Sequence, residues 1–272
     1  MKSEDENSSR LKSVTMLVYE SMLTRMTEEL KILNQEEKEM DQAWFSRMEE
    51  QAAALGINSN ENINLAIIGE RGVGKSTLVN ALTGAHALTG FVECTKKMSK
   101  YDHPQFPHLQ IWDVPGYGTQ STPVECYFEQ YSLFYMDYIL LMVGDHLSVS
   151  DIHFANLCVE YNCPFFLVRS KSDLDVNNLA IEKYYDSYDQ VTSIQQKDLT
   201  QEFAKITHNY MATDQARAGL SEIKFFVISA MRISQITETC SSKLRNRKYP
   251  SVDEEKLLEM LLEQIITRRS IN

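Results

Sequence analysis

Short apolar runs alternate with longer polar or amphipathic stretches through the middle of the chain. Five of these runs have the length of a strand: Ile63–Ile68, Leu109–Val114, Tyr138–Val143, Phe165–Val168 and Phe225–Ile228. Continuous apolar strands separated by helical lengths are typical of a mostly parallel sheet with helices on both faces. The pattern therefore predicts an α/β domain.

The segments on either side of this pattern are predicted to be helical. Residues 1–60 contain no Pro, and no Gly before Gly56, and their apolar residues keep a 3,4 spacing that forms one stripe: Met16, Tyr19, Leu23, Met26, Leu30, Leu33, Met40 and Trp44. Docking of this stripe within the chain is favoured over a dimerisation helix, because Glu37 interrupts the seam. The predicted division is 1–60, a central domain 61–235, and a short C-terminal helical extension 236–272.

The composition limits the cellular location and the binding partners that we expect. The net charge of -11 gives no basic field for a phosphate backbone, so nucleic acid is not an expected partner. The five cysteines lack CxxC pairs, and no apolar run reaches the roughly 20 residues that cross a bilayer. We expect a cytoplasmic protein whose membrane contact is peripheral. The basic run from Lys243 to Lys248, and the pair Arg268 and Arg269, are interpreted as solvated ends of helices rather than membrane-docking sites.

A glycine-rich segment directly follows the first predicted strand. It matches GxxxxGK[ST] and is followed by a predicted helix that runs to Gly84. Backbone N–H groups of such a loop surround phosphates, and the helix N-terminus adds partial positive charge. Lys75 is expected to bridge the β- and γ-phosphates, and Ser76 to bind Mg²⁺. The predicted phosphate-binding residues are Gly69, Glu70, Arg71, Gly72, Val73, Gly74, Lys75, Ser76 and Thr77.

Two further segments are expected near the γ-phosphate. Asp113-Val-Pro-Gly116 ends a predicted strand, which places Asp113 at the sheet edge as a magnesium ligand and the Gly116 N–H near the phosphate. Thr95 lies in a stretch without helical periodicity and is the candidate switch threonine, with Thr89 as its competitor. The predicted metal ligands are Ser76, Thr95 and Asp113; the predicted catalytic residues are Lys75, Thr95 and Gly116.

A base-recognition element follows the fourth apolar run. Ser170-Lys171-Ser172-Asp173 resembles the [NT]KxD element of GTPases, in which the aspartate accepts hydrogen bonds from guanine N1–H and N2–H₂. The Lys171 stem is expected to pack over the base, and Ser170 to hydrogen-bond toward the phosphate loop. Ser229-Ala230 follows the last predicted strand and is expected to approach guanine O6 through a backbone N–H. Together these segments predict GTP or GDP with Mg²⁺ as the bound cofactors.

The order of motifs resembles the immunity-related GTPases. The resemblance rests on GxxxxGKS, Glu93-Cys-Thr95, Tyr101-Asp-His-Pro, Ile111-Trp-Asp-Val-Pro-Gly-Tyr-Gly-Thr119, Tyr127–Tyr138 and Val168–Asp175. It implies a Ras-like P-loop G domain with a mostly parallel six-stranded sheet, preceded by a helical region. It also implies self-association through the nucleotide face, weak hydrolysis accelerated by assembly, and recruitment to intracellular membranes.

The position after Asp-Val-Pro-Gly leaves the hydrolytic mechanism open. GTPases often have a Gln there to hold the attacking water, whereas this chain has Tyr117, a poor substitute. We expect slow basal hydrolysis of GTP, with Glu70 and Arg71, expected to be exposed, as candidates to act across a dimer. A nucleotide-gated binding module with negligible hydrolysis is the alternative. An ATP-dependent kinase is disfavoured by Asp173.

Overall fold

The computed structural model describes residues 28, 42–58, 61–85, 87, 97–117, 124–239 and 245–271. The chain forms two compact units, Met1–Gln51 and Ala52–Asn272. Residues 42–55 are helical. Of the predicted N-terminal stripe only Trp44 is described, with its ring edge-on to Phe45 at 5.1 Å; the other stripe residues lie outside the described residues.

A single mixed sheet organises the second unit. Its strands are β1 (Ile63–Gly69), β2 (Ser99–Asp102), β3 (Leu109–Asp113), β4 (Tyr138–Val143), β5 (Phe165–Arg169) and β6 (Phe225–Val227), in the order β2-β3-β1-β4-β5-β6. All neighbours pair in parallel except β2, which is antiparallel to β3. The five strands expected from apolar runs and the α/β Ras-like fold are confirmed.

The edge strand β2 was not indicated by the hydrophobic pattern. Its sequence Ser-Lys-Tyr-Asp alternates half-buried and exposed positions. An edge strand with one solvated face needs no continuous apolar run, and charged side chains there discourage pairing with another chain.

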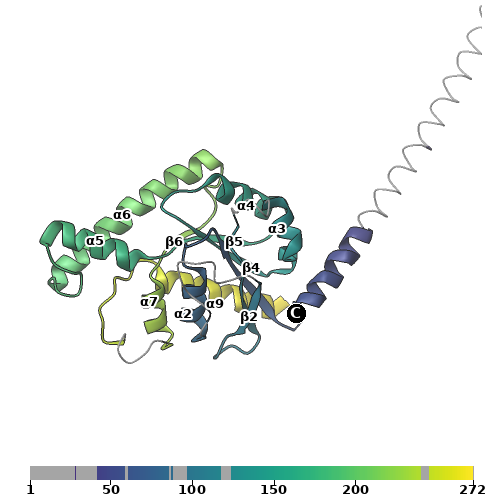
Figure 1. The fold of residues 1–272 in the computed structure, drawn as a ribbon, viewed down its shortest axis with the longest axis horizontal. Helices are drawn as coiled ribbons and strands as arrows, with labels where there is room; N and C mark the ends of the chain where they lie inside the picture. The colour runs from purple at the N-terminus through teal and green to yellow at the C-terminus, as the bar shows by residue number, and fades with distance from the viewer. Residues whose placement is uncertain are drawn as a thin grey trace, which may run out of the picture. The chain divides into compact units, whose positions relative to one another are not determined.

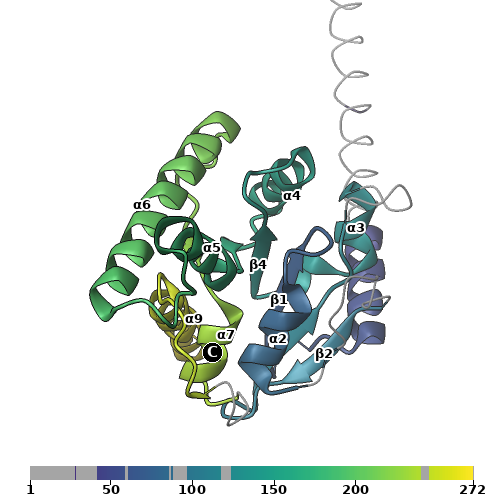
Figure 2. The same ribbon diagram turned by 60° about the vertical axis from the view of Figure 1, so that its left-hand side comes forward.

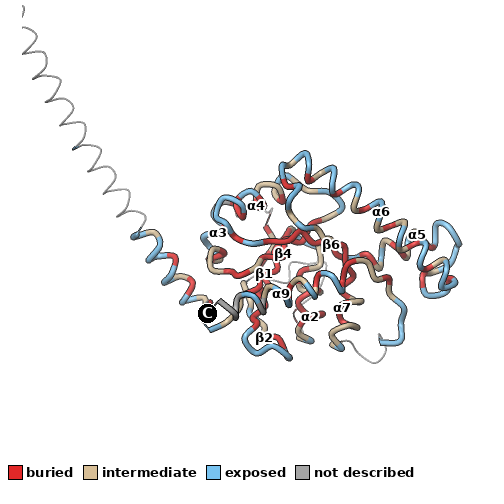
Figure 3. Tube along the Cα trace, turned by 180° about the vertical axis from the view of Figure 1, so that it is seen from behind, coloured by how far each residue is buried: buried red, intermediate tan, exposed pale blue. Residues whose placement is uncertain are grey.

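Helices cover both faces of the sheet (Figure 1). One face carries α2 (Lys75–Thr83), α7 (Ala230–Ile236) and α9 (Glu254–Ile271); the other carries α3 (Val124–Gln130), α4 (Val149–Glu160) and α6 (Ser193–Ala218). Successive side chains of a strand point to opposite faces. Ile67 accordingly packs in the cluster of α2 and α9, and Ile68 in that of α4. In Figure 3 the strands are mostly red and the outer sides of the helices pale blue.

Helix α5 (Ser172–Tyr184) belongs to a third, smaller core. Val176 and Ala180 of α5 pack with Leu199 and Phe203 of α6 and with Val227 of β6. Figure 2 shows α5 and α6 on one side of the sheet and β2 on the opposite side. A short 3₁₀ helix, Leu133–Tyr135, precedes β4. The loop after β5 therefore opens between α5 and α7, where the base-recognition residues were expected.

Helix ends follow local chemistry. Helix α2 ends at Gly84, as predicted, and Gly84 adopts the left-handed conformation with φ 69° that a C-terminal glycine tolerates. Helix α4 begins with a reciprocal capping box between Ser148 and Asp151. Helix α9 lies where the C-terminal helix was expected and buries Leu257 and Leu261 in the core. Over the part of the chain that the structure describes, no helix combines the length and apolar character needed to cross a bilayer.

Candidate functional site

The phosphate loop connects β1 to α2 and is tied to the base motif. Gly74 has φ 100°, and a Cβ there would lie 2.7 Å from Ser170 Oγ. Only glycine combines this left-handed backbone with so close an approach. Ser170 Oγ donates to the Val73 carbonyl, and Lys171 Nζ donates to the Gly72 carbonyl at 2.6 Å. The expected contact of Ser170 with the phosphate loop is therefore present.

Lys75 lies beneath this loop with its ammonium almost out of solvent. Its Nζ donates to the carbonyls of Gly69 at 3.0 Å and Glu70 at 2.8 Å, and the residue is 8% exposed. Burial lowers the pKa of Lys75 to about 8; the nearby Arg71 adds to this effect and Asp113 opposes it. A buried cation with a lowered pKa is stabilised by an arriving anion, so the loop is chemically suited to phosphate.

The sheet brings Ser76 and Asp113 together from distant parts of the sequence. Strands β1 and β3 are neighbours with Ile67 opposite Asp113, and Ser76 Oγ donates to Asp113 Oδ2 at 2.7 Å. Mg²⁺ binds oxygen ligands, and a phosphate-loop hydroxyl beside a carboxylate is a pair that fits this ion. A Cβ on Gly116 would lie 3.1 Å from Lys75 Nζ, so the backbone of Gly116 lies against the lysine. Thr95 and Thr89 lie outside the described residues.

Tyr117, the residue after Asp-Val-Pro-Gly, belongs to the core. It is 1% exposed, its ring stacks on Phe154 at 5.3 Å, and its hydroxyl donates to Asp151 Oδ1. Burial, with Asp151 beside it, raises the pKa of Tyr117 well above its usual value. The structure therefore gives Tyr117 a packing role, with its hydroxyl already bonded to Asp151.

Glu70 is less accessible than the sequence analysis expected. It is half-buried, and its Oε1 accepts a hydrogen bond from Ser148 Oγ at 2.8 Å. The expectation that Glu70 is exposed in the loop is wrong, because the N-terminus of α4 packs close enough to engage its carboxylate. Arg71 is exposed, as expected.

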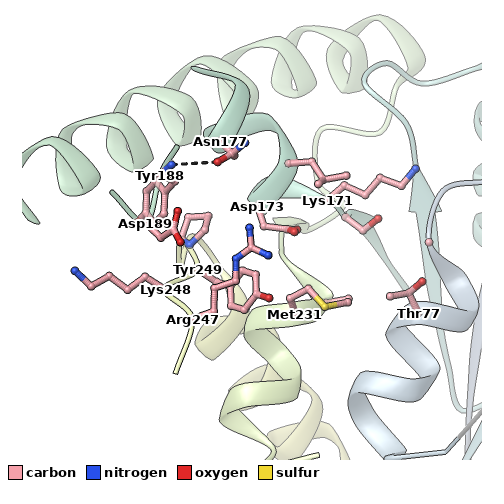
Figure 4. A pocket seen from close by; sticks show the side chains of 15 residues that line it. Thr77, Lys171, Asp173, Asn177, Tyr188, Asp189, Met231, Arg247, Lys248 and Tyr249 are labelled. Carbon is pink, nitrogen blue, oxygen red and sulfur yellow. Dashed lines mark hydrogen bonds between the residues drawn. The ribbon is translucent and has the colours of Figure 1, made fainter. Parts of the chain in front are cut away.

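A cavity of about 440 Å³ opens beside the base motif (Figure 4). Its walls come from the phosphate loop, α2, α5, the segment after α5, α7 and the segment before α9. The lining residues are Gly74, Thr77, Ser170, Lys171, Asp173, Leu174, Asn177, Tyr188, Asp189, Ala230, Met231, Arg247, Lys248, Tyr249 and Pro250. Asp173 lies in the first turn of α5. The predicted base-recognition residues Ser170, Lys171, Asp173 and Ala230 are thus brought to one cavity.

Ser229 supports this cavity from behind. It is fully buried, its Oγ accepts from the Arg232 N–H at 3.2 Å as the N-cap of α7, and its own N–H donates to Glu254 Oε1 at 2.6 Å. The Ser229 N–H is therefore already used within the protein. The residue of this pair that lines the cavity is Ala230.

The segment Arg247–Pro250 and the carboxylate of Glu254 were not assigned to this site from the sequence. Arg247 and Lys248 were interpreted as part of a solvated basic run; they are exposed, and they also line the base cavity. No motif signals this placement, because the segment reaches the cavity only through the packing of α7 and α9. At its end, the pair Tyr249-Pro250 is a local signal that favours an ordered turn.

The strand order and the arrangement of phosphate loop, Asp113 and base cavity define the P-loop GTPase class. The chain belongs to the interferon-inducible GTPase (IIGP) family, whose model matches residues 31–270.

Several mammalian proteins share sequence with this chain. Mouse interferon-gamma-inducible GTPase 10 is 36% identical over 132 residues, which are 46% of this chain and 32% of the relative. Mouse interferon-inducible GTPase 1 is 33% identical over 124 residues, 43% of this chain and 30% of the relative. Bovine interferon-inducible GTPase 5 is 34% identical over 128 residues, 45% of this chain and 28% of the relative. The chain thus matches less than a third of each relative's length.

Among solved structures, the bacterial selenocysteine-specific elongation factor EF-Sec superposes with a TM-score of 0.42 and 18% identity. It covers 74% of this chain, and the match covers 29% of that protein. The fold assignment rests on the strand order and the phosphate loop of this chain.

Proposed function

We propose that this protein binds GTP and GDP with Mg²⁺ and hydrolyses GTP to GDP and phosphate. The observation that carries the proposal is the placement of Lys75, Asp113 and Asp173 at or just after the carboxyl ends of three parallel strands of one sheet. Ligands of open α/β sheets bind at this edge. A carboxylate for a metal ion at β3, a cation for phosphates after β1 and a carboxylate for a purine edge after β5 therefore lie along one edge of the sheet.

Each residue has a distinct role in the proposed site. Lys75 neutralises the phosphates, and Ser76 and Asp113 would hold the magnesium ion. The ion, when bound, supplies positive charge that offsets the charge of the phosphoryl group. The Gly116 backbone lies beside Lys75, where its N–H can meet the γ-phosphate. Thr95 stays the proposed switch residue, and Lys75 and Gly116 the proposed catalytic residues within the described part.

Slow basal turnover is part of the proposal. The buried position of Tyr117 supports it, because this side chain leaves no group at position 117 to hold water. The loss of one transition-state partner costs about 10³ to 10⁵ in rate for phosphoryl transfer. Specific activity measured over a series of protein concentrations tests the need for a second copy. An increase with concentration supports assembly-driven hydrolysis, and a constant rate contradicts it.

Self-association through the nucleotide face and peripheral contact with intracellular membranes from the cytoplasmic side are proposed on family membership. Exposed Arg71 in the phosphate loop supports the first, because it is available to a partner. Charge reversal by Arg71→Glu is expected to abolish the rise of specific activity with concentration. Fractionation of cells with and without GTP loading tests the second; a chain that never sediments with membranes contradicts it.

The variant Asp173→Asn tests base recognition. An amide presents an N–H where guanine also presents donors, so affinity for GDP is expected to fall about 100-fold, while xanthosine diphosphate, which offers an acceptor, gains affinity. Calorimetry with Mg²⁺ measures both.

Asp189→Asn is the matched control for Asp173→Asn, because Asp189 lines the same cavity without belonging to the motif. It should leave the preference for guanine unchanged. Equal nucleotide preferences in the native chain and Asp173→Asn would contradict the assigned role of Asp173.

A further inference from the structure

The base cavity has a wall that the GTPase motifs do not supply. Arg247, Lys248, Tyr249 and Pro250 line it together with the motif residues and lie between α7 and α9 in the chain. They face Tyr188 and Asp189, which come from the segment between α5 and α6. The inference drawn below deepens the proposed function and rests on it.

This wall is held in place at both ends. Gln235 of α7 donates through Nε2 to the Arg247 carbonyl at 2.7 Å, and Pro250 is buried. Three residues further, the Val227 N–H of β6 donates to Asp253 Oδ2 at 3.0 Å, and the Asp253 N–H returns a bond to the Val227 carbonyl at 3.1 Å. The segment is therefore anchored to β6, the strand that precedes the Ser229-Ala230 pair.

The side chains of the wall form a surface suited to a planar ligand. The Arg247 guanidinium lies over the Tyr249 ring at 5.6 Å. Figure 4 shows this guanidinium reaching into the cavity between Tyr249 and Asp173, while the Lys248 ammonium points away. A guanidinium is planar and stacks on aromatic faces, which an ammonium does not do.

The charge across the cavity mouth is complementary. A hydrogen bond from Ser187 is the main cause that lowers the pKa of Asp189, and Arg247 and Lys248 contribute to the same effect. Asp189 belongs to the opposite wall, so the two walls attract each other at the open side of the cavity.

We propose that Arg247 lies on the face of the bound purine and, with Tyr249 behind it, forms a stacked wall of the nucleotide site. The purine then has the Lys171 stem of the GTPase motif and the Arg247 guanidinium as contacts. In this proposal the segment before α9 forms part of the guanine-binding site. A stacked contact adds affinity for any purine and does not choose among purine bases.

The test measures binding of GDP and inosine diphosphate with Mg²⁺ by calorimetry to the full chain and three variants. Arg247→Ala is expected to weaken both nucleotides about tenfold. Arg247→Lys keeps the charge but not the plane, so it should lose nearly as much. Arg245→Ala removes the same charge two residues away at an exposed position outside the cavity, and should bind within about twofold of the native chain.

Each outcome decides the proposal. Equal affinity of the native chain and Arg247→Ala would overturn it and leave the proposed function intact. Full affinity of Arg247→Lys, or a loss that is equal in Arg245→Ala, would also overturn it, because long-range charge would then explain the effect. A changed ratio between GDP and inosine diphosphate would show an edge contact and contradict stacking. A native chain that binds no guanine nucleotide would remove both proposals. Melting of Arg247→Ala without nucleotide is expected to match the native chain, since the side chain is exposed.

Discussion

At the scale of single residues, two neighbours in the chain have different places in the structure: one lies at the candidate phosphate site and the next is buried in the core. Gly116 lies against Lys75 at the phosphate loop, whereas the next residue, Tyr117, is packed on Phe154 with its hydroxyl bonded to Asp151. The sequence identified position 117 as one where a catalytic side chain is often found. Only the packing shows that the side chain here points into the core.

The variant Tyr117→Phe separates packing from catalysis. It keeps the stacked ring and removes the hydroxyl, so buried Asp151 loses a donor and the free energy of unfolding should fall by about 1–3 kcal/mol. Basal GTP turnover, measured with saturating nucleotide, should stay within a few fold. Denaturant unfolding supplies the stability.

Tyr185→Phe is the matched control, because Tyr185 is 90% exposed and the same atom is removed. Its stability should not change measurably. A hundredfold fall in turnover for Tyr117→Phe without a fall in stability would show that the hydroxyl acts in catalysis.

Among the elements, α9 contributes most to the site without carrying a motif. Two consecutive carboxylates at its start, Asp253 and Glu254, accept the N–H groups of Val227 and Ser229. Glu254 is fully buried and also accepts from the Val252 N–H at 2.6 Å. The last strand and the turn that presents Ala230 therefore depend on the N-terminus of α9.

The ionisation of Glu254 gives this element a pH signature. Burial raises the pKa of Glu254 to about 7 against an ordinary value of 4.5, although its backbone donors act in the opposite direction. Between these values the folded protein keeps a proton that the unfolded chain releases. The free energy of unfolding is therefore expected to fall as pH rises from about 4.5 to about 7, by about 3 kcal/mol from this group.

Glu254→Gln removes this titration, so the difference in stability between the native chain and the variant should change across that window. Urea unfolding at a series of pH values measures it. Glu255→Gln is the control, because Glu255 is exposed and its pKa is lowered, so it titrates below the window. Asp253, with a pKa lowered to about 2, and His208 bonded to it are present in both proteins, so their contributions cancel in the difference in stability between the native chain and the variant. A native curve parallel to that of Glu254→Gln would contradict the assignment.

At the scale of the whole molecule, the core of the second unit extends beyond the predicted central domain. Ala52 and Ile57 pack in the cluster of α4, and Leu257 and Leu261 in that of α2. The predicted domain 61–235 holds all six strands, but the sheet has apolar surface on both faces that residues on either side of this range help to cover. The division into 1–60, 61–235 and 236–272 stays a prediction.

Truncation of a single leucine in α9 tests whether this helix is part of the G-domain core. Leu257 is 1% exposed, and Leu257→Ala is expected to lower the free energy of unfolding by about 2–5 kcal/mol. Leu262 lies on the same helix and is 37% exposed, so Leu262→Ala should cost clearly less. Calorimetric melting compares them. Equal effects would mean that α9 folds apart from the sheet.

The amino-acid sequence by itself determined the five apolar strands, the helix ending at Gly84 and the candidate residues for binding phosphate, metal and base. Each of these features depends on residues that are close together in the sequence, so a local pattern is enough to predict it. The hydrophobic pattern did not predict edge strand β2, because a strand with one solvated face has no continuous run of apolar residues.

Only the tertiary structure decided the burial of Tyr117, the bond between Glu254 and Ser229, and the place of Arg247 in the base cavity. Each depends on residues far apart in the chain that the sheet order and the packing of α4, α7 and α9 bring together. A local sequence pattern cannot predict such a contact, because the residues that lie between the two partners in the chain do not indicate that the partners will be neighbours in space.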